Sequence, residues 1–247
     1  MKRFKCIVAY DGTQFNGFQI QQNQRTVQGE IQKALKKVHK GEEIIIQASG
    51  RTDTNVHANG QAIHFDTTLS LTSEQWKRAL NTQLPSDVFI KKVEEVSEDF
   101  HARYNVERKE YRYAIWNHKD EDVFRRHYHY HYPYQLNIEL MKEALQHFVG
   151  TYDFTSFCSA KTEKENKVRT IYSATLEEVN QEIVISLVGS GFLHNMVRII
   201  IGTLVEIGNG RREMHSIKEA LNGANRKLAG KTAPPHGLVL WEVNYNN

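Results

Sequence analysis

The 247-residue sequence has the composition of an ordinary globular protein, with 40% hydrophobic and 25% charged residues. Only four prolines are present, which argues against long disordered segments. The formal net charge of +3 permits a nucleic-acid partner but does not require one. The two cysteines, Cys6 and Cys158, have no CxxC spacing, so the sequence excludes a disulfide framework and predicts buried thiols in a reducing compartment.

Neither a membrane segment nor a signal peptide is predicted. The most apolar run, residues 196–207, carries Arg198 and Glu206 and is shorter than the roughly 18 residues that a spanning helix needs. The first residues, 1–12, are basic but lack an apolar core and a small-residue cleavage site. We therefore expect a cytoplasmic protein with no membrane partner.

The first half of the chain alternates between strand and helix patterns. One helix is predicted to begin after Thr26 and to end with Gly41 as its C′ glycine, and another begins with a capping box between Thr72 and Gln75. Strand patterns are found at residues 4–9, 44–47, 61–66 and 88–96. The second and third strands flank the glycine-bounded loop that contains Asp53, and loops held by rigid strands often carry functional residues.

From about residue 105 a second set of elements begins. A hairpin is predicted around Asn180-Gln181, joining strands at residues 170–179 and 183–188. The other predicted elements are strands at 110–116 and 238–243 and helices at 138–149, 195–207 and 216–221. Because there is no regular strand-helix-strand rhythm, we predict an α+β fold with a largely antiparallel sheet, divided into residues 1–104 and 105–247.

The helix at residues 195–207 raises an electrostatic question. Apolar residues surround Arg198 on nearly every face, which predicts a buried helix and a buried guanidinium that needs an anionic partner. Asp53, a single acid in a loop of small and polar residues, is a candidate for that partner. Two simpler interpretations stay open: Asp53 in an Asx-turn between strands, and Arg198 in a salt bridge at the surface.

Basic and aromatic residues alternate in "FHARYNVERKEYRY", residues 100–113. This composition suits RNA, since cations meet phosphates and rings stack on splayed bases. Arg103, Arg108 and Lys109 are therefore candidate RNA contacts. A half-buried strand with a solvated charged face explains the same pattern.

"RRHYHYHYPY", residues 125–134, is rich in histidine. An extended chain would place His127, His129 and His131 on one face, which could suggest zinc or a metal-dependent nuclease. No cysteine or further histidine completes a closed site, so we predict no metal. Aromatic packing or an RNA-facing strand is the alternative interpretation.

Taken together, five segments resemble the tRNA pseudouridine synthases of the TruA type. They occur in the family's order and are "YDGTQFNGFQIQQNQRTVQGEI", "GRTDTNVHA", "FHARYNVERKEYRY", "GFLHNMVR" and "APPHGL". The resemblance implies the pseudouridine synthase fold, with two α/β subdomains whose antiparallel-rich mixed sheets join across a central basic cleft. It also implies a homodimer that isomerises uridine to pseudouridine in the anticodon stem-loop of tRNA, around positions 38, 39 and 40, without a cofactor.

The resemblance assigns roles to individual residues. Asp53 matches the essential catalytic aspartate, and Arg198 matches the buried arginine that pairs with it. Tyr111 matches the tyrosine that stacks on the target uracil and supports catalysis by assisting proton transfer. Three further residues match substrate-binding positions: Arg51, which helps to extrude the target nucleotide, His57, and Leu238, which closes the pocket beneath the base.

Two residues depart from the family pattern. Asn55 stands where glycine is usual, and Phe18 stands where tryptophan is usual. Asparagine is among the few residues that tolerate a left-handed backbone, so Asn55 is expected to preserve the loop. The departure also leaves open a divergent paralogue that binds tRNA with altered site preference or little catalysis.

Overall fold

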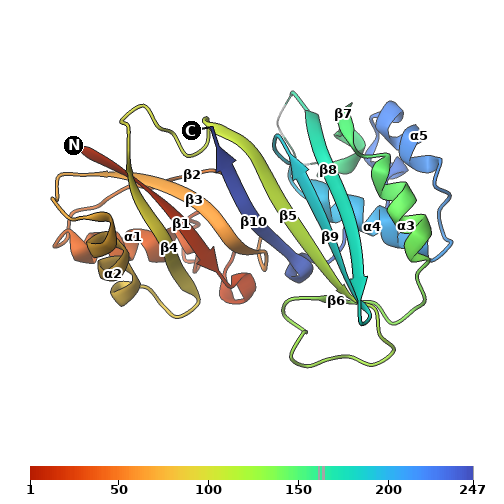
Figure 1. The fold of residues 1–247 in the computed structure, drawn as a ribbon, viewed down its shortest axis with the longest axis horizontal. Helices are drawn as coiled ribbons and strands as arrows, with labels where there is room; N and C mark the ends of the chain where they lie inside the picture. The colour runs from red at the N-terminus through yellow and green to blue at the C-terminus, as the bar shows by residue number, and fades with distance from the viewer. Residues whose placement is uncertain (161, 163–164, 247) are drawn as a thin grey trace. The chain divides into compact units, whose positions relative to one another are not determined.

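The computed structural model describes residues 1–160, 162 and 165–246 (Figure 1). The chain divides into two compact units. The first unit comprises residues 1–107 and 239–247, and the second comprises residues 108–238. Each unit has its own strands and helices, so the two are described in turn.

The first unit is built on a mixed sheet in which antiparallel pairs predominate. Its strands are β1 (Lys2–Tyr10), β2 (Gln47–Ala48), β3 (His57–Thr67), β4 (Val88–Val96) and β10 (Leu238–Tyr245). The order of the main strands is β4-β1-β3-β10, and β2 pairs with β3. β1 is antiparallel to both neighbours, whereas β10 runs parallel to β3.

Helices α1 (Val27–Val38) and α2 (Ser73–Gln83) supply the other half of this unit's core (Figure 1). Alternate residues of β1 are buried, because successive side chains of a strand point to opposite faces. The ring of Trp76 on α2, fully buried, lies 5.8 Å from that of Phe4 and 5.1 Å from that of Phe65 between centroids. The aromatic residues of strands and helix thus share one core.

The caps of both helices follow from local sequence. The capping box between Thr72 and Gln75 is present in full, and the Thr26 side chain accepts a hydrogen bond from the backbone of Gly29. The C′ prediction for Gly41 is wrong by one residue. Lys40 takes the left-handed position (φ 54°), and the Gly41 N–H donates to Lys36 O at 2.8 Å, as the residue after C′ does in a Schellman motif.

The strands of the second unit are mostly antiparallel. Its strands are β5 (Val106–Trp116), β6 (Tyr130–His131), β7 (Gly150–Asp153), β8 (Val168–Val179) and β9 (Glu182–Gly189). The order is β5-β9-β8-β7, with β6 parallel to β5. Asn180 and Gln181 both have positive φ (50° and 67°), the geometry of a type I′ turn, which confirms the predicted hairpin.

Helices α3 (Ile138–Gln146), α4 (Met196–Gly208) and α5 (Ser216–Gly223) group together beside β8 in Figure 1. Eleven of the residues of α4 are buried, so this helix forms the centre of the second unit's core. Within α4, Arg198 and Glu206 keep partial exposure. α3 ends three residues earlier than predicted, and β7 follows it.

The predicted α+β class is confirmed, since strands and helices mix in both units and antiparallel pairs predominate. The last strand differs from its predicted place. β10 belongs with the first unit, where Val239 pairs with His57 and Leu240 with Ala58, although residues 105–247 were expected to form one subdomain. The two paired strands are about 180 residues apart in sequence, so no local sequence pattern predicts that they pair.

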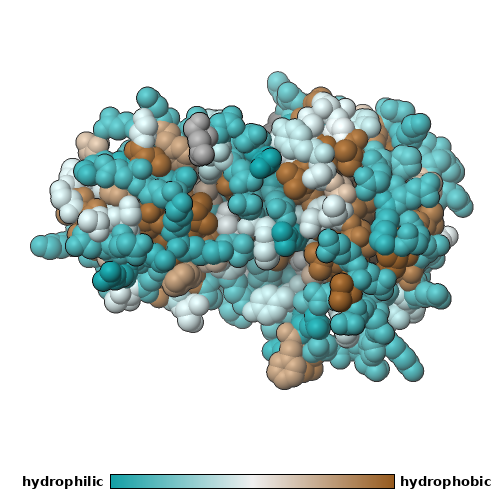
Figure 2. Space-filling model, in the orientation of Figure 1, coloured by the Kyte–Doolittle hydropathy of each residue, from teal (hydrophilic) through white to brown (hydrophobic). Residues whose placement is uncertain are grey.

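Hydrophilic residues predominate on the face drawn in Figure 2, with hydrophobic residues scattered among them. This agrees with the burial of most large apolar side chains in the two cores. Within the described residues, no helix is long and apolar enough to cross a bilayer.

Candidate active site

Asp53 lies on the loop between β2 and β3, residues 49–56, which we call the aspartate loop. The loop is fastened at its base, where Ser49 N–H donates to Ala62 O at 2.8 Å. The buried Gln61 side chain also accepts from the Ser49 hydroxyl at 2.6 Å and donates to Gly50 O at 3.0 Å. These bonds satisfy the polar groups where the chain leaves the strand pair.

The residue before Asp53 is held from two directions. Thr52 O accepts from Phe18 N–H at 3.0 Å, and the Thr52 hydroxyl lies 2.7 Å from the Tyr10 hydroxyl. Thr52 and Tyr10 are both buried. On the other side, Val56 N–H donates to Asp53 O at 3.1 Å. The backbone of Asp53 is therefore fixed at both ends, while the residue as a whole is only partly buried.

Two positions in this region have a left-handed backbone. Asn55 has φ 61°, so the conformation usual for glycine is kept by one of the few residues that tolerate it. Gly17 has φ +83°, and a Cβ there would lie 2.9 Å from Thr52 O. Glycine is thus required at residue 17 for the close approach of the two loops.

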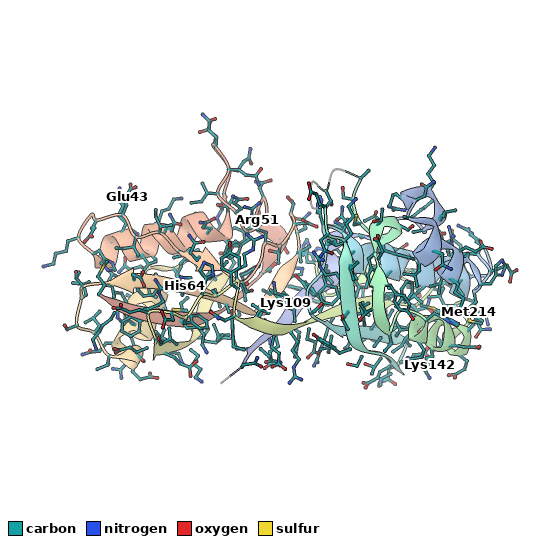
Figure 3. All side chains as sticks on the ribbon, turned by 90° about the horizontal axis from the view of Figure 1, so that it is seen from above. Glu43, Arg51, His64, Lys109, Lys142 and Met214 are labelled. Atoms are coloured by element: carbon teal, nitrogen blue, oxygen red, sulfur yellow. The ribbon has the colours of Figure 1, made fainter. Side chains whose placement is uncertain are left out.

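His57 and Arg51 occupy opposite environments on either side of Asp53. The ring of His57 is buried, and its Nδ1 accepts a hydrogen bond from Gly12 N–H at 2.9 Å. Nδ1 also lies 3.2 Å from Asp11 Oδ1, but the bond from Gly12 requires the neutral Nε2–H tautomer. His57 therefore braces the loop from beneath. Arg51 is exposed; its position is labelled in Figure 3.

In the second unit, Tyr111 is a half-buried residue of β5. It pairs with Leu187 of β9, and its ring meets that of Phe192 edge to face at 5.1 Å between centroids. Phe192 precedes α4 in the "GFLHNMVR" segment. The strand and the turn before α4 thus position this ring together.

Arg198 lies in the first turn of α4 and is half-buried, so its burial is less than the apolar helix predicted. It is three positions after the N-cap residue Asn195, which places it at the end of the helix and not in its buried middle. Its Nε–H donates to Ala233 O and its Nη1–H to Asn195 Oδ1, both at 2.8 Å. Ala233 N–H returns a bond to Arg198 O at 3.0 Å. The guanidinium is oriented by two fixed acceptors.

Leu238 is buried at the end of the short 3₁₀ turn Pro235–Gly237. The Tyr113 hydroxyl donates to Pro234 O at 2.8 Å, and a Cβ at Gly237 would lie 2.9 Å from the Tyr113 ring. Burial raises the pKa of Tyr113, which the nearby Arg198 charge partly offsets. The hydroxyl therefore stays protonated and holds the "APPHGL" turn on β5.

Asp53, Arg51 and His57 thus belong to the first unit, whereas Tyr111, Arg198 and Leu238 belong to the second. Hydrogen bonds within one unit hold the backbone at Asp53 and the side chains of His57 and Arg198. Their combination into one site, including the pairing of Asp53 with Arg198, stays a prediction.

The three candidate RNA contacts differ in exposure. Arg103 and Arg108 are exposed, and Lys109 on β5 is half-buried (Figure 3). Arg103 belongs to the first unit and the other two to the second. Their contact with RNA also stays a prediction.

The histidine-rich segment does not form the extended strand that could suggest a zinc site. Residues 123–128 turn, and only Tyr130 and His131 are in a strand. His129 Nε2 lies 3.1 Å from Glu182 Oε1, and His131 Nε2–H donates to His118 O at 2.8 Å. Among the described residues, no group of His, Cys, Asp and Glu is arranged to hold a metal ion. The histidines brace a surface loop.

Sequence reasoning missed the residues that support the aspartate loop. Tyr10, Gly17 and Gln61 hold it from β1, the segment after β1, and β3. Gln61 gave a signal as a polar residue within an apolar strand pattern, and Tyr10 and Gly17 lie in the first of the family-like segments, which assigned them no role.

Comparison with known proteins agrees with this arrangement of motifs. The family model described as tRNA pseudouridine synthase matches residues 6–105 and 144–246. The chain is 61% identical to tRNA pseudouridine synthase A 1 of Bacillus cereus over 247 residues, covering 100% of both chains. It is 56% identical to tRNA pseudouridine synthase A of Anoxybacillus flavithermus, with the same coverage.

Among solved structures, an archaeal box H/ACA sRNP Nop10–Cbf5 complex matches at 10% identity and a TM-score of 0.39. The match covers 91% of this chain and 59% of that one, and it is too weak to support a conclusion. The family model and the full-length relatives carry the assignment. The chain belongs to the tRNA pseudouridine synthase family, the isomerases that convert uridine of tRNA to pseudouridine.

Proposed function

We propose that this chain isomerises uridines of the tRNA anticodon stem-loop, around positions 38, 39 and 40, with Asp53 as the catalytic residue. The observation that carries the proposal is the construction of the aspartate loop. Its backbone is fixed on both sides of Asp53, yet this residue is only partly buried. A rigid support for a reactive side chain is what positioning for catalysis requires.

The reaction needs no co-reactant, because it is an isomerisation. The bond between N1 of uracil and C1′ of ribose breaks, the base turns, and C5 bonds to C1′. The proton on C5 is lost and N1 regains one, so atoms and electrons balance. Asp53 acts in this sequence as a carboxylate, either by attacking C1′ or the uracil ring or by removing a proton.

The other residues act on the base and on the carboxylate. Arg198 is the cationic partner of Asp53 in this proposal, since its guanidinium is already oriented by Ala233 and Asn195. Tyr111 stacks on the uracil, and Leu238 closes the pocket beneath it. Arg51, exposed beside Asp53, fills the space that the extruded nucleotide leaves.

His57 contributes to substrate binding through the loop that it supports and not by reaching the base. Its burial and its bond from Gly12 N–H favour this role. Arg103, Arg108 and Lys109 contact the tRNA backbone. We further propose that the protein works as a homodimer in the cytoplasm, where its tRNA substrate is found.

Asn55 motivated the alternative of a tRNA-binding paralogue with altered site preference or little catalysis. Its φ of 61° favours the catalytic proposal, because the loop conformation is kept without glycine. Single-turnover incubation with unmodified tRNA separates the two: the binder would form a complex without pseudouridine.

The decisive experiment compares Asp53→Asn with Asp99→Asn, an exposed acid of the same unit. We expect Asp53→Asn to lower the rate of pseudouridine formation by about four orders of magnitude or more, while tRNA binding and the melting curve stay near wild type. Asp99→Asn should keep its activity. Mapping pseudouridine across a full tRNA pool tests site choice as well, and full activity in folded Asp53→Asn would contradict the proposal.

A further inference from the structure

Tyr104 in the first unit is largely exposed to solvent, although its ring contacts neighbouring side chains. Its side chain is 76% exposed, although its ring lies on that of His101 at 4.3 Å between centroids and 36° between planes. The guanidinium carbon of Arg103 is 5.8 Å from the centre of the same ring. A flat ring is thus supported on one neighbour, flanked by a cation, and otherwise open to solvent.

The backbone beneath this ring is fixed to the sheet of the first unit. Ala102 is fully buried, its N–H donates to His64 Nδ1 at 3.1 Å, and its carbonyl accepts from the Tyr245 hydroxyl at 2.7 Å. Arg3 donates to Phe100 O at 2.8 Å and forms a bidentate pair with Asp66 at 2.7 Å. Strands β1, β3 and β10 therefore all hold the segment that presents Tyr104.

The two histidines of this region have defined acceptor atoms. Burial, with the nearby charges of Arg3 and His101, lowers the pKa of His64 to about 4, so its Nδ1 is free to accept from Ala102 at neutral pH. His101 Nδ1 accepts from Arg103 N–H at 3.1 Å. Asn105 N–H donates to His101 O at 3.1 Å and closes the turn. The orientation of the His101 ring is thereby set.

An exposed, preorganised ring beside a cation is suited to stack on a nucleobase. Every base has a π-face, and a ring that is already fixed loses little conformational entropy on binding. The flanking guanidinium can meet the phosphate of the same nucleotide. Neither feature is needed for the stability of the first unit, because an aromatic ring in solvent contributes little to the core.

We propose that Tyr104, supported by His101 and flanked by Arg103, is a stacking platform for an unpaired base of the tRNA substrate. This stacking proposal depends on the proposed function in one respect: it takes tRNA as the ligand. Tyr104 contributes to substrate affinity and not to the chemical step. Its ring, and not its hydroxyl, carries the interaction.

The test measures binding of unmodified tRNA and the kinetics of pseudouridine formation in single variants. Tyr104→Ala should weaken tRNA binding about 5- to 100-fold, the effect of losing one stacked base, and raise KM to match. Its kcat should stay within about twofold of wild type, since the ring contacts no reacting atom. Tyr104→Phe should restore binding, because the ring is kept.

Two controls separate stacking from other causes. Phe89→Ala removes another exposed aromatic ring of the first unit, 51% exposed, and should leave binding unchanged. In Tyr104→Ala, the slope of log Kd against log salt concentration should be the same as in wild type. In Arg103→Ala, the slope should fall by about one, because one phosphate contact is lost. If Tyr104→Ala weakened binding through a structural defect, its melting curve would change, and Tyr104→Phe would not restore binding.

Wild-type affinity in Tyr104→Ala would overturn the proposal, and so would an equal loss in Tyr104→Phe or in Phe89→Ala. A protein that binds tRNA through Tyr104 but forms no pseudouridine would refute the proposed function alone. Conversely, full isomerase activity with unchanged tRNA affinity in Tyr104→Ala would refute only the platform.

Discussion

The aspartate loop of the first unit and the histidine loop of the second, residues 117–131, are both polar surface segments, but they are held by different forces. The aspartate loop is fastened by backbone carbonyls and buried neutral side chains such as Tyr10 and Gln61. The histidine loop also has neutral bonds, such as that from His131 to His118 O, but it differs in having charged side chains among its contacts. Arg125 lies between Asp122 and Glu182 and over the Trp116 ring at 4.6 Å.

This difference matters because the two kinds of contact respond differently to solvent. Buried neutral hydrogen bonds are insensitive to salt, whereas part-exposed ion pairs are screened and depend on pH. A loop that must hold a reacting carboxylate within a fraction of an ångström benefits from the first kind. The histidine loop, which exposes 88% of Phe124 at its turn, needs no such precision for the isomerisation.

Among the variants that test this comparison, the largest effect is expected from Gly17→Ala in the contact with the aspartate loop. The new Cβ would meet Thr52 O at 2.9 Å in a left-handed backbone, so the loop must move. We expect kcat to fall about 100-fold and the free energy of unfolding to fall by about 2–3 kcal/mol, from strain and a weakened Phe18–Thr52 bond. Urea unfolding and single-turnover rates measure the two effects.

Gly210→Ala is the matched control for this strain. Gly210 has φ +75°, and a Cβ there would have no neighbour within 4 Å among the described residues. We expect a loss of only about 1 kcal/mol, with activity kept. If both variants kept wild-type kcat, the aspartate loop would not need its close contact with Gly17.

Tyr10→Phe tests the neutral character of the aspartate loop. It removes the partner of the Thr52 hydroxyl in a buried site, which should lower the free energy of unfolding by about 1–2 kcal/mol. The loss should be the same at low and at molar salt, since no charge is involved. A loss that disappears in salt would show that charges hold this loop too.

Glu182→Gln tests the ionic character of the histidine loop. We expect a loss of about 0.5–1 kcal/mol at low salt and near-neutral pH that disappears at molar salt, because Glu182 is part-exposed. Burial alone would raise the pKa of Glu182, but hydrogen bonds from His129 and Arg125 lower it overall.

The pH dependence of Glu182→Gln follows from that shift. A carboxyl whose pKa is lower in the folded state stabilises the protein above its ordinary pKa, and this contribution is lost as the pH falls through the folded value. The difference between wild type and Glu182→Gln should therefore shrink in acid. Thermal melting from neutral pH downward measures it, and a constant difference would rule out the ion pairs as its source.

The smallest effect is expected from Asn55→Gly in the aspartate loop. Glycine adopts the φ of 61° without strain but adds freedom to the unfolded chain, so stability should change by no more than about 0.5 kcal/mol. Activity should be unchanged. A large loss of kcat would instead give the Asn55 side chain a role of its own in the reaction.

Several features were predictable because neighbours in sequence decide them. The capping box at Thr72, the cap at Thr26 and the turn at Asn180-Gln181 each depend on residues within about four positions. The buried stripe of α4 also follows from its own composition. Asp53 was singled out by its loop and by the family resemblance.

Other features of the site involve residues far apart in sequence. Arg198 was predicted to be buried because the helix is apolar all round, but it is half-buried, and its guanidinium donates to Ala233, 35 residues away. The alternation of His127, His129 and His131 suggested a metal site. It did not predict that His129 contacts Glu182 or that His131 donates to His118 O. Neither contact leaves a periodic pattern.

Local pattern alone specified the helices, the hairpin and the α+β class, because periodicity, caps and turns act over a few residues. Tertiary structure decided that β10 joins the first unit, and that Tyr10, Gly17 and Gln61 fasten the aspartate loop. The physical reason is that strand register and close backbone approach depend on which distant segments meet. A reactive residue can be named from its motif, but its support is built from the rest of the chain.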